Sequence, residues 1–436
     1  MLSSLVLLLS SAAGSALALN NGLATTPQMG WNTWNYHACE INSSVILDAA
    51  SAIKQRGLDQ LGYKYVVIDD CWQAAERDSQ GRIPADPQKW PGGLKNVTDA
   101  VHQMGLLAGI YSSAGVLTCG RRLGSLDHEE VDANSWAEAG FDYLKYDNCF
   151  NQGRAGTPKL SFDRYNAMGE ALNKTGRAIL YSACNWGEDG PWNFGSEIFN
   201  SWRMSGDVAN SFDRASDYCP CESTIGCQLA GFHCNIRKII NMAAPLGQKA
   251  GPGRWNDLDM LQVGNGALNR DESITHFSLW SALKSPLILG NDVSTDLTRF
   301  SNESLAIVAN EHVIAVNQDP LGTPAERILN LDSGTHQIWT GPLTNGSYVV
   351  AMVNFAEEPW TRTLTLADIF YDAGKEDQQA RSAAWNVYDL WAGVDYEAPA
   401  RRELTLMEGS PFRESLAEST IPPHGTVMLR LTPAEQ

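Results

Sequence analysis

The sequence predicts an α/β protein in which a (β/α)8 TIM barrel is followed by a C-terminal antiparallel β-sandwich domain. Three observations indicate this fold class. Short, almost continuously apolar segments alternate with helical segments through about the first 320 residues, as in a parallel sheet covered by helices. Residues 61–70 and 139–147 repeat one pattern: a helix end, a glycine, an aromatic strand and an aspartate. After residue 322 the strands follow one another without helices between them.

The barrel is expected to contain eight parallel strands. Eight βα units over roughly 300 residues fit a closed barrel better than an open sheet. The strands are predicted at residues 28–32, 65–68, 106–111, 140–149, 178–184, 202–206, 258–263 and 286–289. Helices are predicted at residues 43–56, 129–138, 163–172, 236–243 and 274–283.

The C-terminal domain is predicted to consist of antiparallel strands. Asn345-Gly346 between the first two is a strong hairpin signal. We therefore divide the chain into a signal peptide at 1–18, a catalytic barrel at 19–322 and a β domain at 323–436. The strands of the last domain are expected at residues 336–343, 347–355, 361–366, 384–391, 403–407 and 426–431.

Composition narrows the possible partners. A hydrophobic fraction of 43% is ample for a packed core. The net charge of −18 and the pI near 4.8 argue against nucleic acid and against anionic membrane surfaces as partners. No segment of the mature chain is apolar enough to span a bilayer. A neutral ligand fits better, and 14 Trp and 13 Tyr suit a site that stacks sugar rings, although most of them will lie in the core.

The N-terminus resembles a secretory signal. Residues 2–19 contain an apolar stretch followed by Ala16-Leu17-Ala18, a small-x-small cleavage pattern that leaves Leu19 or Asn20 first, although no Lys or Arg precedes the apolar run. We therefore expect a secreted, extracellular protein. Five Asn-x-Ser/Thr sequons fit a glycoprotein: Asn42, Asn96, Asn173, Asn302 and Asn345.

The nine cysteines agree with export because an oxidising compartment favours disulfides. One of them, Cys184, is left without a partner. Zinc ligation by the cysteine cluster is the alternative, but its Cys-x-Cys spacing lacks the CxxC of a knuckle, and we expect no metal site. The four possible pairs are Cys39 with Cys71, Cys119 with Cys149, and two among Cys219, Cys221, Cys227 and Cys234.

The strand at residues 140–149 ends in a candidate nucleophile. Alternate strand residues share a face, so Tyr143, Lys145 and Asp147 should point the same way. A lysine beside an aspartate favours the ionised carboxylate. An ionised carboxylate at the C-terminal end of a buried strand suits a nucleophile. The alternative is a lone Lys/Asp pair that caps a strand.

Four aspartates fall at C-terminal strand ends, where a barrel of this type carries its chemistry: Asp69, Asp70, Asp147 and Asp207. Retaining glycoside hydrolysis needs two carboxyl groups about 5–5.5 Å apart, one as nucleophile and one as acid/base. Asp147 suits the first role and Asp207 the second, with Arg203 four residues away on a shared strand face. Adjacent Asp69 and Asp70 require a turn, which presents two acceptors to neighbouring hydroxyls.

Two other interpretations of these aspartates remain. Paired aspartates can ligate Mg²⁺ or Ca²⁺, but Cys71 and Trp72 are poor neighbours for a hard cation. Strand-end aspartates can also cap the following helices. Capping is credible for any one of them and weak for all four together.

As an ordered set, these motifs resemble glycoside hydrolase family 27, the retaining α-galactosidases (melibiases), and in particular the secreted fungal members. The resemblance covers the chain from about Asn21 to its C-terminus. The loop with four cysteines, 219–234, departs from the animal members and resembles the fungal type. The matching residues are 22–24, 26–34, 68–72, 109–111, 144–149, 202–203 with Asp207, and 255–260.

The resemblance implies a role for each matching residue. Asp147 would be the nucleophile and Asp207 the acid/base, with the pKa of Asp207 expected above that of Asp147. No cofactor is implied. Galactose would be held at its 4- and 6-hydroxyls by Asp69 and Asp70, at its 3- and 4-hydroxyls by Lys145 and near its 2-hydroxyl by Arg203, in a pocket lined by Trp34, Tyr111, Asp259 and Met260.

The resemblance also implies what Cys184 and Trp186 do. They lie where the family distinguishes the substituent on C2, and members that accept N-acetylgalactosamine carry small residues there. A hydroxyl should therefore fit beside Cys184 and Trp186, and an acetamido group should clash. The alternative is that Trp186 packs into the barrel core and Cys184 is an inert strand residue.

The expected activity is exo-acting release of terminal α-galactose from oligosaccharides and galactomannan side chains by double displacement. The alternatives are α-N-acetylgalactosaminidase or β-L-arabinopyranosidase activity on the same scaffold, or an inactive lectin-like galactose binder. The C-terminal domain is expected to pack against the barrel, with a second sugar-binding module as the alternative. Disulfides are expected at Cys39–Cys71 and Cys119–Cys149, and as the nested pairs Cys219–Cys234 and Cys221–Cys227.

Overall fold

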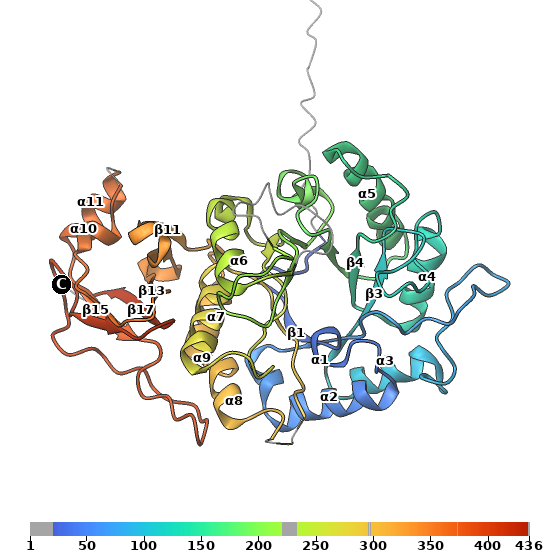
Figure 1. The fold of residues 1–436 in the computed structure, drawn as a ribbon, viewed down its shortest axis with the longest axis horizontal. Coiled ribbons are helices and arrows are strands. Elements are labelled where there is room, and N and C mark those ends of the chain that lie inside the picture. Colours follow the sequence, from blue (N-terminus) through green and yellow to red (C-terminus); the bar gives the residue numbers. More distant parts are fainter. Residues whose placement is uncertain (1–20, 220–232, 295, 297, 373, 435–436) are drawn as a thin grey trace, which may run out of the picture.

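A computed structural model describes residues 21–219, 233–294, 296, 298–372 and 374–434 (Figure 1). Within these residues, none of the helices has the length and apolar character needed to cross a membrane. The predicted signal peptide and the predicted pair Cys221–Cys227 lie outside the described residues.

The barrel is a sheet of eight parallel strands in the order β10-β1-β2-β3-β4-β5-β6-β9. The two ends of this order meet where Leu261, just past β9, pairs in parallel with Leu289 of β10, which closes the ring. The barrel of eight parallel strands is thus confirmed, with seven of the strands overlapping their predicted ranges. The strands are β1 Met29–Asn32, β2 Tyr65–Val67, β3 Leu107–Ser113, β4 Tyr143–Asp147, β5 Leu180–Cys184, β6 Ser201–Arg203, β9 Trp255–Asp257 and β10 Leu287–Leu289.

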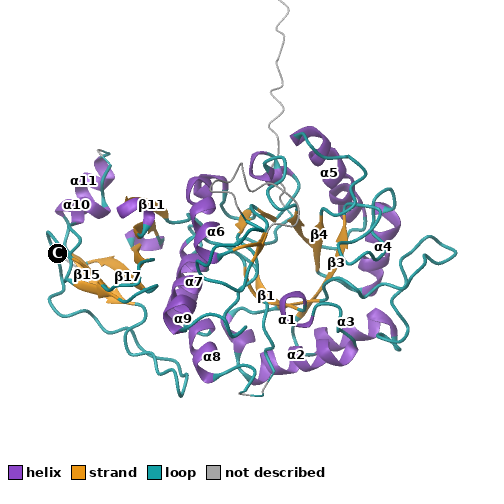
Figure 2. Cartoon of the chain, in the orientation of Figure 1, coloured by secondary structure: helices purple, strands orange, loops and turns teal. Residues whose placement is uncertain are grey.

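Helices surround this ring of strands (Figure 2). Local signals explain several of their starts: the Thr157 side chain caps the helix at Leu160 N with Pro158 in the first turn, and Asn269 and Glu272 form a capping box. The helices are α1 Trp34–His37, α2 Ser43–Gln55, α3 Gly93–Gln103, α4 Glu129–Ala139, α5 Pro158–Lys174, α6 Ile236–Ala243, α7 Arg270–Ala282, α8 Asn302–Val308 and α9 Glu311–Asn317.

One barrel strand was predicted in the wrong place. The apolar run at residues 258–263 is not the seventh strand, which is β9, the shorter and more polar segment before it. Asp259 has φ +84°, a left-handed conformation that interrupts an extended strand within that run. The alternation of strands and helices also lapses once, because only short 3₁₀ turns occupy the fully described segment 185–200 between β5 and β6.

The C-terminal domain contains a five-stranded antiparallel sheet in the order β11-β12-β13-β17-β15 and a two-stranded sheet of β14 and β16. The hairpin predicted at Asn345-Gly346 joins β12 to β13, with Asn345 at φ +59°. The strands are β11 Glu326–Leu331, β12 His336–Pro342, β13 Tyr348–Asn354, β14 Trp360–Arg362, β15 Trp385–Asp389, β16 Ser419–Ile421 and β17 Thr426–Pro433.

Three predictions for this domain were wrong in detail. The strand expected at 361–366 ends at Arg362, because Thr365 begins a capping box for α10, Leu366–Ile369. The strand expected at 403–407 is a single bridge between Leu406 and Tyr388. The domain also contains helices, α10 and α11, Lys375–Ser382, where strands alone were expected.

The larger C-terminal sheet packs on both of its faces. Side chains of a strand alternate between faces, and in β13 Val349, Ala351 and Val353 join the barrel's core, whereas Val350 and Met352 join the sandwich's own core. Figure 1 shows α6 and α7 between the barrel strands and this sheet. The sandwich is therefore an integral packing partner of the barrel.

Candidate active site

A pocket of ≈ 360 Å³ lies at the C-terminal ends of the barrel strands. The structure brings 11 of the 12 residues predicted for catalysis or substrate binding to its wall, and only Asp70 is missing from the lining. The 11 residues are Trp34, Asp69, Tyr111, Lys145, Asp147, Cys184, Trp186, Arg203, Asp207, Asp259 and Met260.

Asp147 ends β4 and is 6% exposed. Its two oxygens are held separately: Tyr111 donates its hydroxyl to Oδ2 at 2.7 Å, and the backbone N–H of Asn148 donates to Oδ1 at 2.8 Å. Burial raises the pKa of Asp147 to about 7, with Lys145 opposing the rise and the charge of Asp207 adding to it.

The sequence predicts that Lys145 pairs with Asp147, but in the structure its ion pair is with Asp69. Its ammonium lies 2.8 Å from Oδ2 of Asp69, which also accepts a hydrogen bond from Asn32 at 2.7 Å. Burial lowers the pKa of Lys145, but its acidic neighbours, Asp69 first among them, outweigh burial and hold the pKa above its ordinary value. Lys145 thus stays charged between Asp69 and Asp147 without keeping Asp147 ionised by itself.

Asp207 lies beside the guanidinium of Arg203, with Nη2 3.0 Å from Oδ1. The pair does not share one strand face, because β6 ends at Arg203 and Asp207 opens a separate strand, β7, Asp207–Val208. Burial would raise the pKa of Asp207, but Arg203, and then Lys145 and His233, lower it below its ordinary value. The predicted order of the two pKa values is therefore reversed in the free site.

Arg203 also joins Asp207 to Asp259. Its Nη1 lies 2.9 Å from Oδ1 of Asp259, whose Oδ2 accepts the backbone N–H of Val208 at 2.7 Å. Burial raises the pKa of Asp259 to about 6, against the lowering effect of Arg203. One buried guanidinium therefore holds two carboxylates on one side of the pocket.

Asp70 sits behind the pocket. The turn predicted for Asp69-Asp70 is present, since Cys71 has φ +74°. The Asp70 carboxylate accepts hydrogen bonds from Thr118 Oγ1 at 2.8 Å, from Gly120 N at 2.7 Å and from Cys71 N at 2.7 Å. In this structure Asp70 holds the loop at residues 118–120.

Cys184 and Trp186 both face the pocket. Cys184 is a buried free thiol opposite Asp147 in the β4–β5 register, and Arg203 Nη1 lies 3.6 Å from its sulfur. Burial raises the pKa of this thiol, so it is not a thiolate. Trp186 adopts a left-handed backbone with φ +57° just after β5.

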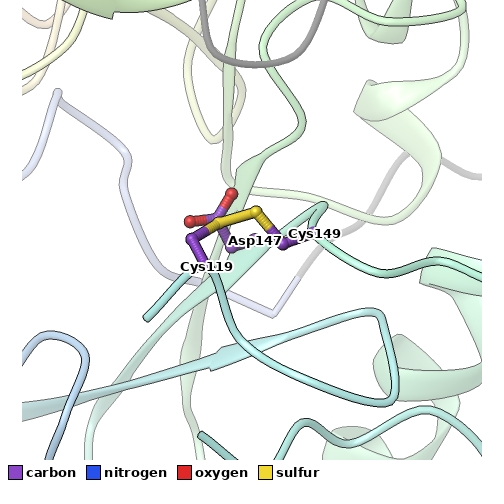
Figure 3. Close-up of side chains that lie close together, drawn as sticks. All are labelled: Cys119, Asp147 and Cys149. Carbon is purple, nitrogen blue, oxygen red and sulfur yellow. A yellow bond between two sulfur atoms is a disulfide. The ribbon is translucent and has the colours of Figure 1, made fainter. Parts of the chain in front are cut away.

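Three of the predicted disulfides are present: Cys39–Cys71, Cys119–Cys149 and Cys219–Cys234. Figure 3 shows that the Cys119–Cys149 disulfide lies beside the carboxylate of Asp147. Both cysteines belong to the pocket wall, although they were predicted only as a disulfide and not as lining residues. Because their sulfurs are bonded to each other, this group offers no thiolates for a metal ion.

Asn35 and His233 also line the pocket without having been predicted. His233 reaches it because β8, His233–Cys234, pairs with β7 and places His233 opposite Asp207. Neither residue belongs to a recognisable sequence motif. The one feature that could have pointed to His233 is its place next to Cys234, in the loop with four cysteines.

The five sequons differ in their surroundings. Asn42, Asn96, Asn173 and Asn345 are exposed. Asn302 is half-buried, and its side-chain nitrogen donates to the carbonyl of Glu397 at 2.6 Å.

Comparison with known proteins identifies the family. Residues 26–319 match the model described as "Alpha galactosidase A", and residues 333–431 match the "Alpha galactosidase C-terminal beta sandwich domain". Alpha-galactosidase 2 of Saccharomyces cerevisiae is 44% identical over 95% of each chain. The crystal structure of alpha-galactosidase I from Mortierella vinacea superposes with a TM-score of 0.86 at 49% identity, over 96% of this chain and 100% of that one. An alpha-galactosidase structure from Saccharomyces cerevisiae with raffinose gives a TM-score of 0.86 at 42% identity, over 95% and 99% of the two chains. The chain belongs to the α-galactosidases of glycoside hydrolase family 27.

Proposed function

We propose that the chain hydrolyses terminal α-D-galactosyl residues with retention of configuration, with Asp147 as nucleophile and Asp207 as acid/base. The observation that carries this proposal is the meeting of two carboxylates, the buried Asp147 and the partly exposed Asp207, in one pocket, each with a different set of partners. Asp147 would attack the anomeric carbon while Asp207 protonates the departing oxygen. Asp207 would then take a proton from the water that releases galactose.

The neighbouring side chains support these roles. Tyr111 and the N–H of Asn148 fix both oxygens of Asp147, so the nucleophile needs no reorientation before attack. Asp69 and Lys145 form an ion pair in the pocket wall that can bind adjacent sugar hydroxyls. Arg203 would lie near the 2-hydroxyl, and Trp34, Tyr111, Asp259 and Met260 would complete the wall.

The substrate class follows from the pocket and from the relatives. We infer that oligosaccharides and galactomannan side chains with terminal α-galactose are bound. The raffinose bound to a related α-galactosidase and the net charge of −18 of this chain, which disfavours anionic ligands, support this class. We also infer a secreted glycoprotein with a signal peptide at 1–18, a barrel at 19–322 and a β domain at 323–436, because the disulfides fit an oxidising compartment.

The anomeric form of the first product tests the chemistry. Proton NMR of galactose released by the wild-type protein should show the α-anomer first, before mutarotation. Asp147→Asn should abolish turnover and leave the circular dichroism spectrum unchanged, whereas Asp163→Asn, on the exposed face of α5, should leave both unchanged. Release of β-galactose first would exclude double displacement.

A further inference from the structure

We propose that the C-terminal sandwich positions the acid/base: the turn at His424 holds the segment 207–213, which carries Asp207. The proposal rests on the role assigned to Asp207 above. His424 lies outside the pocket wall and would act as a positioning residue.

The segment that carries Asp207 has little regular structure of its own. β7 is two residues long, and among the described strands its partner is β8, also two residues long. Beyond it, Ala209 N donates to Cys234 O at 2.7 Å, and Ser211 N donates back to Ala209 O at 2.8 Å as the chain turns. The Asp207 side chain is 37% exposed, and Arg203 is its one close ionic contact among the described residues. The placement of its backbone therefore decides where its proton is delivered.

The far end of this segment is clamped by the sandwich. Phe212 is 3% exposed, and its ring stacks on that of His424, with centroids 4.9 Å apart and planes 28° apart. The ring of Phe355, at the end of β13, lies 5.7 Å away. The next residue, Asp213, has its Oδ2 3.8 Å from Nε2 of His424.

His424 is in turn fixed to the barrel by α7. Its Nδ1 lies 2.9 Å from Oε1 of Glu272, and its carbonyl accepts a hydrogen bond from Thr275 Oγ1 at 2.7 Å. Glu357 adds a third carboxylate, 3.2 Å from Nε2. The backbone of His424 is left-handed, with φ +57°.

The ring of His424 thus has its plane set by Phe212 and its in-plane direction set by Glu272. This geometry connects α7, which is buried from Ser273 to Ala282, to the segment of the acid/base through one side chain of the sandwich. A shift of about 1 Å in a reacting group can lower a rate by about 100-fold. Removing the clamp should therefore weaken proton delivery selectively.

The test compares two leaving groups. Raffinose releases a sugar alkoxide that must be protonated, whereas p-nitrophenyl α-galactoside releases a phenolate that needs little acid help. His424→Asn removes the ring and keeps a residue that tolerates left-handed φ, and Phe212→Leu removes the stack. We expect about tenfold loss of kcat/KM on raffinose in both variants and less than about twofold loss on the nitrophenyl substrate.

His336→Asn is the matched control. His336 also lies in the sandwich, with Nδ1 2.7 Å from Asp332 and its ring 4.7 Å from that of Trp360, but these partners belong to the sandwich itself. Its variant should keep the wild-type ratio of the two kcat/KM values. This ratio does not depend on the fraction of folded enzyme, so a purely structural defect leaves it unchanged.

Equal losses on both substrates in His424→Asn and Phe212→Leu would overturn the proposal. Asp207→Ala, measured alongside, distinguishes a failure of the acid/base assignment from a failure of the positioning role of His424. If Asp207→Ala itself shows no dependence on the leaving group, the assignment of the acid/base fails. If Asp207→Ala shows it and the clamp variants do not, only the positioning role fails.

Discussion

Asp147 and Asp207 have different neighbours, and these neighbours decide which of the two carboxyl groups carries a proton. Burial raises the pKa of Asp147 to about 7, and the negative charge of Asp207 contributes to that rise. Arg203 keeps the pKa of Asp207 low. In the free site the Asp147–Asp207 pair therefore holds one proton just below about pH 7, and this proton rests on Asp147. The proposed mechanism needs this proton on Asp207 and an ionised Asp147, and moving it between them does not change the total charge. The apparent pKa values in a pH profile of activity therefore belong to the pair and not to either residue alone.

This protonation predicts the alkaline limit of activity. Above about pH 7 the pair loses its last proton, and no acid remains to protonate the leaving oxygen. The value of kcat/KM on raffinose should then fall about tenfold per pH unit, while an activated aryl galactoside should lose less. In Asp207→Asn the pKa of Asp147 should move below about 7, because one of the charges that raise it is gone. A level kcat/KM on raffinose up to about pH 9 would contradict this.

Selectivity at C2 is a second property that we predict from single residues. Cys184 and Trp186 both face the pocket, so a C2 acetamido group would meet two buried side chains. Overpacking typically costs about 1–3 kcal/mol, which is about 5- to 150-fold in kcat/KM. We expect at least about tenfold preference for p-nitrophenyl α-galactoside over its N-acetylgalactosaminide analogue, reduced in Trp186→Ala combined with Cys184→Ser.

The matched control for C2 selectivity is Trp192→Ala. Trp192 lies on the same loop but not in the wall of this pocket, so its variant should keep the preference. Comparable kcat/KM values of the wild-type protein on the two substrates would refute the role of Cys184 and Trp186.

Site residues could be predicted where charged residues stand at the C-terminal end of an apolar strand. Asp147 and Lys145 stand at the end of such a strand, and both line the pocket. The partner of Lys145 could not be predicted, because Asp69 reaches it from the loop after a different strand, β2, and is 76 residues away in the sequence. His233 enters through a pairing of two-residue strands that leaves no periodic signal.

At the scale of elements, apolar runs located most of the barrel and misplaced one strand. β9 contains Asn256 and Asp257, whose side chains face partners that only the fold supplies: Asn256 accepts a hydrogen bond from the indole N–H of Trp202 at 2.9 Å. The apolar run at 258–263 is buried in the following turn, where Asp259 has positive φ. Hydrophobicity predicted burial there correctly, whereas the backbone conformation depended on tertiary contacts.

Helix α7 is a case in which the helix could be predicted but the burial of its polar residues could not. It was predicted as a helix, but beyond its first turn every residue from Ser273 to Ala282 is buried, including His276 and several serines and threonines. This part lies between the barrel and the sandwich, so it has no solvent face. Its polar side chains bond to partners such as Trp391 of the sandwich and the backbone of Gln262, and a local pattern cannot show either.

Over the whole molecule, the barrel and the sandwich share one apolar core. Residues of the sandwich, among them Trp339, Val353 and Trp391, belong to the same buried cluster as the barrel residues. Polar contacts also cross the boundary: Asn241 of α6 accepts hydrogen bonds from Arg327 at 2.7 Å and from Gln337 at 2.9 Å. Separating the two parts would expose this surface and leave buried polar groups unpaired.

The shared core predicts one cooperative unfolding unit. Trp391 donates its indole N–H to Ser278 of α7 at 2.9 Å, and truncation of a buried tryptophan to alanine typically costs about 3–5 kcal/mol. In urea, Trp391→Ala should lower the midpoint for loss of activity, which reports the barrel, by the same amount as the midpoint from far-UV circular dichroism. Trp360→Ala, in the half-buried strand β14 of the sandwich, should lower both midpoints together by a smaller amount, because Trp360 loses less buried surface. If the sandwich unfolded independently, either variant would shift the circular dichroism signal and leave the midpoint for activity where it is in the wild-type protein.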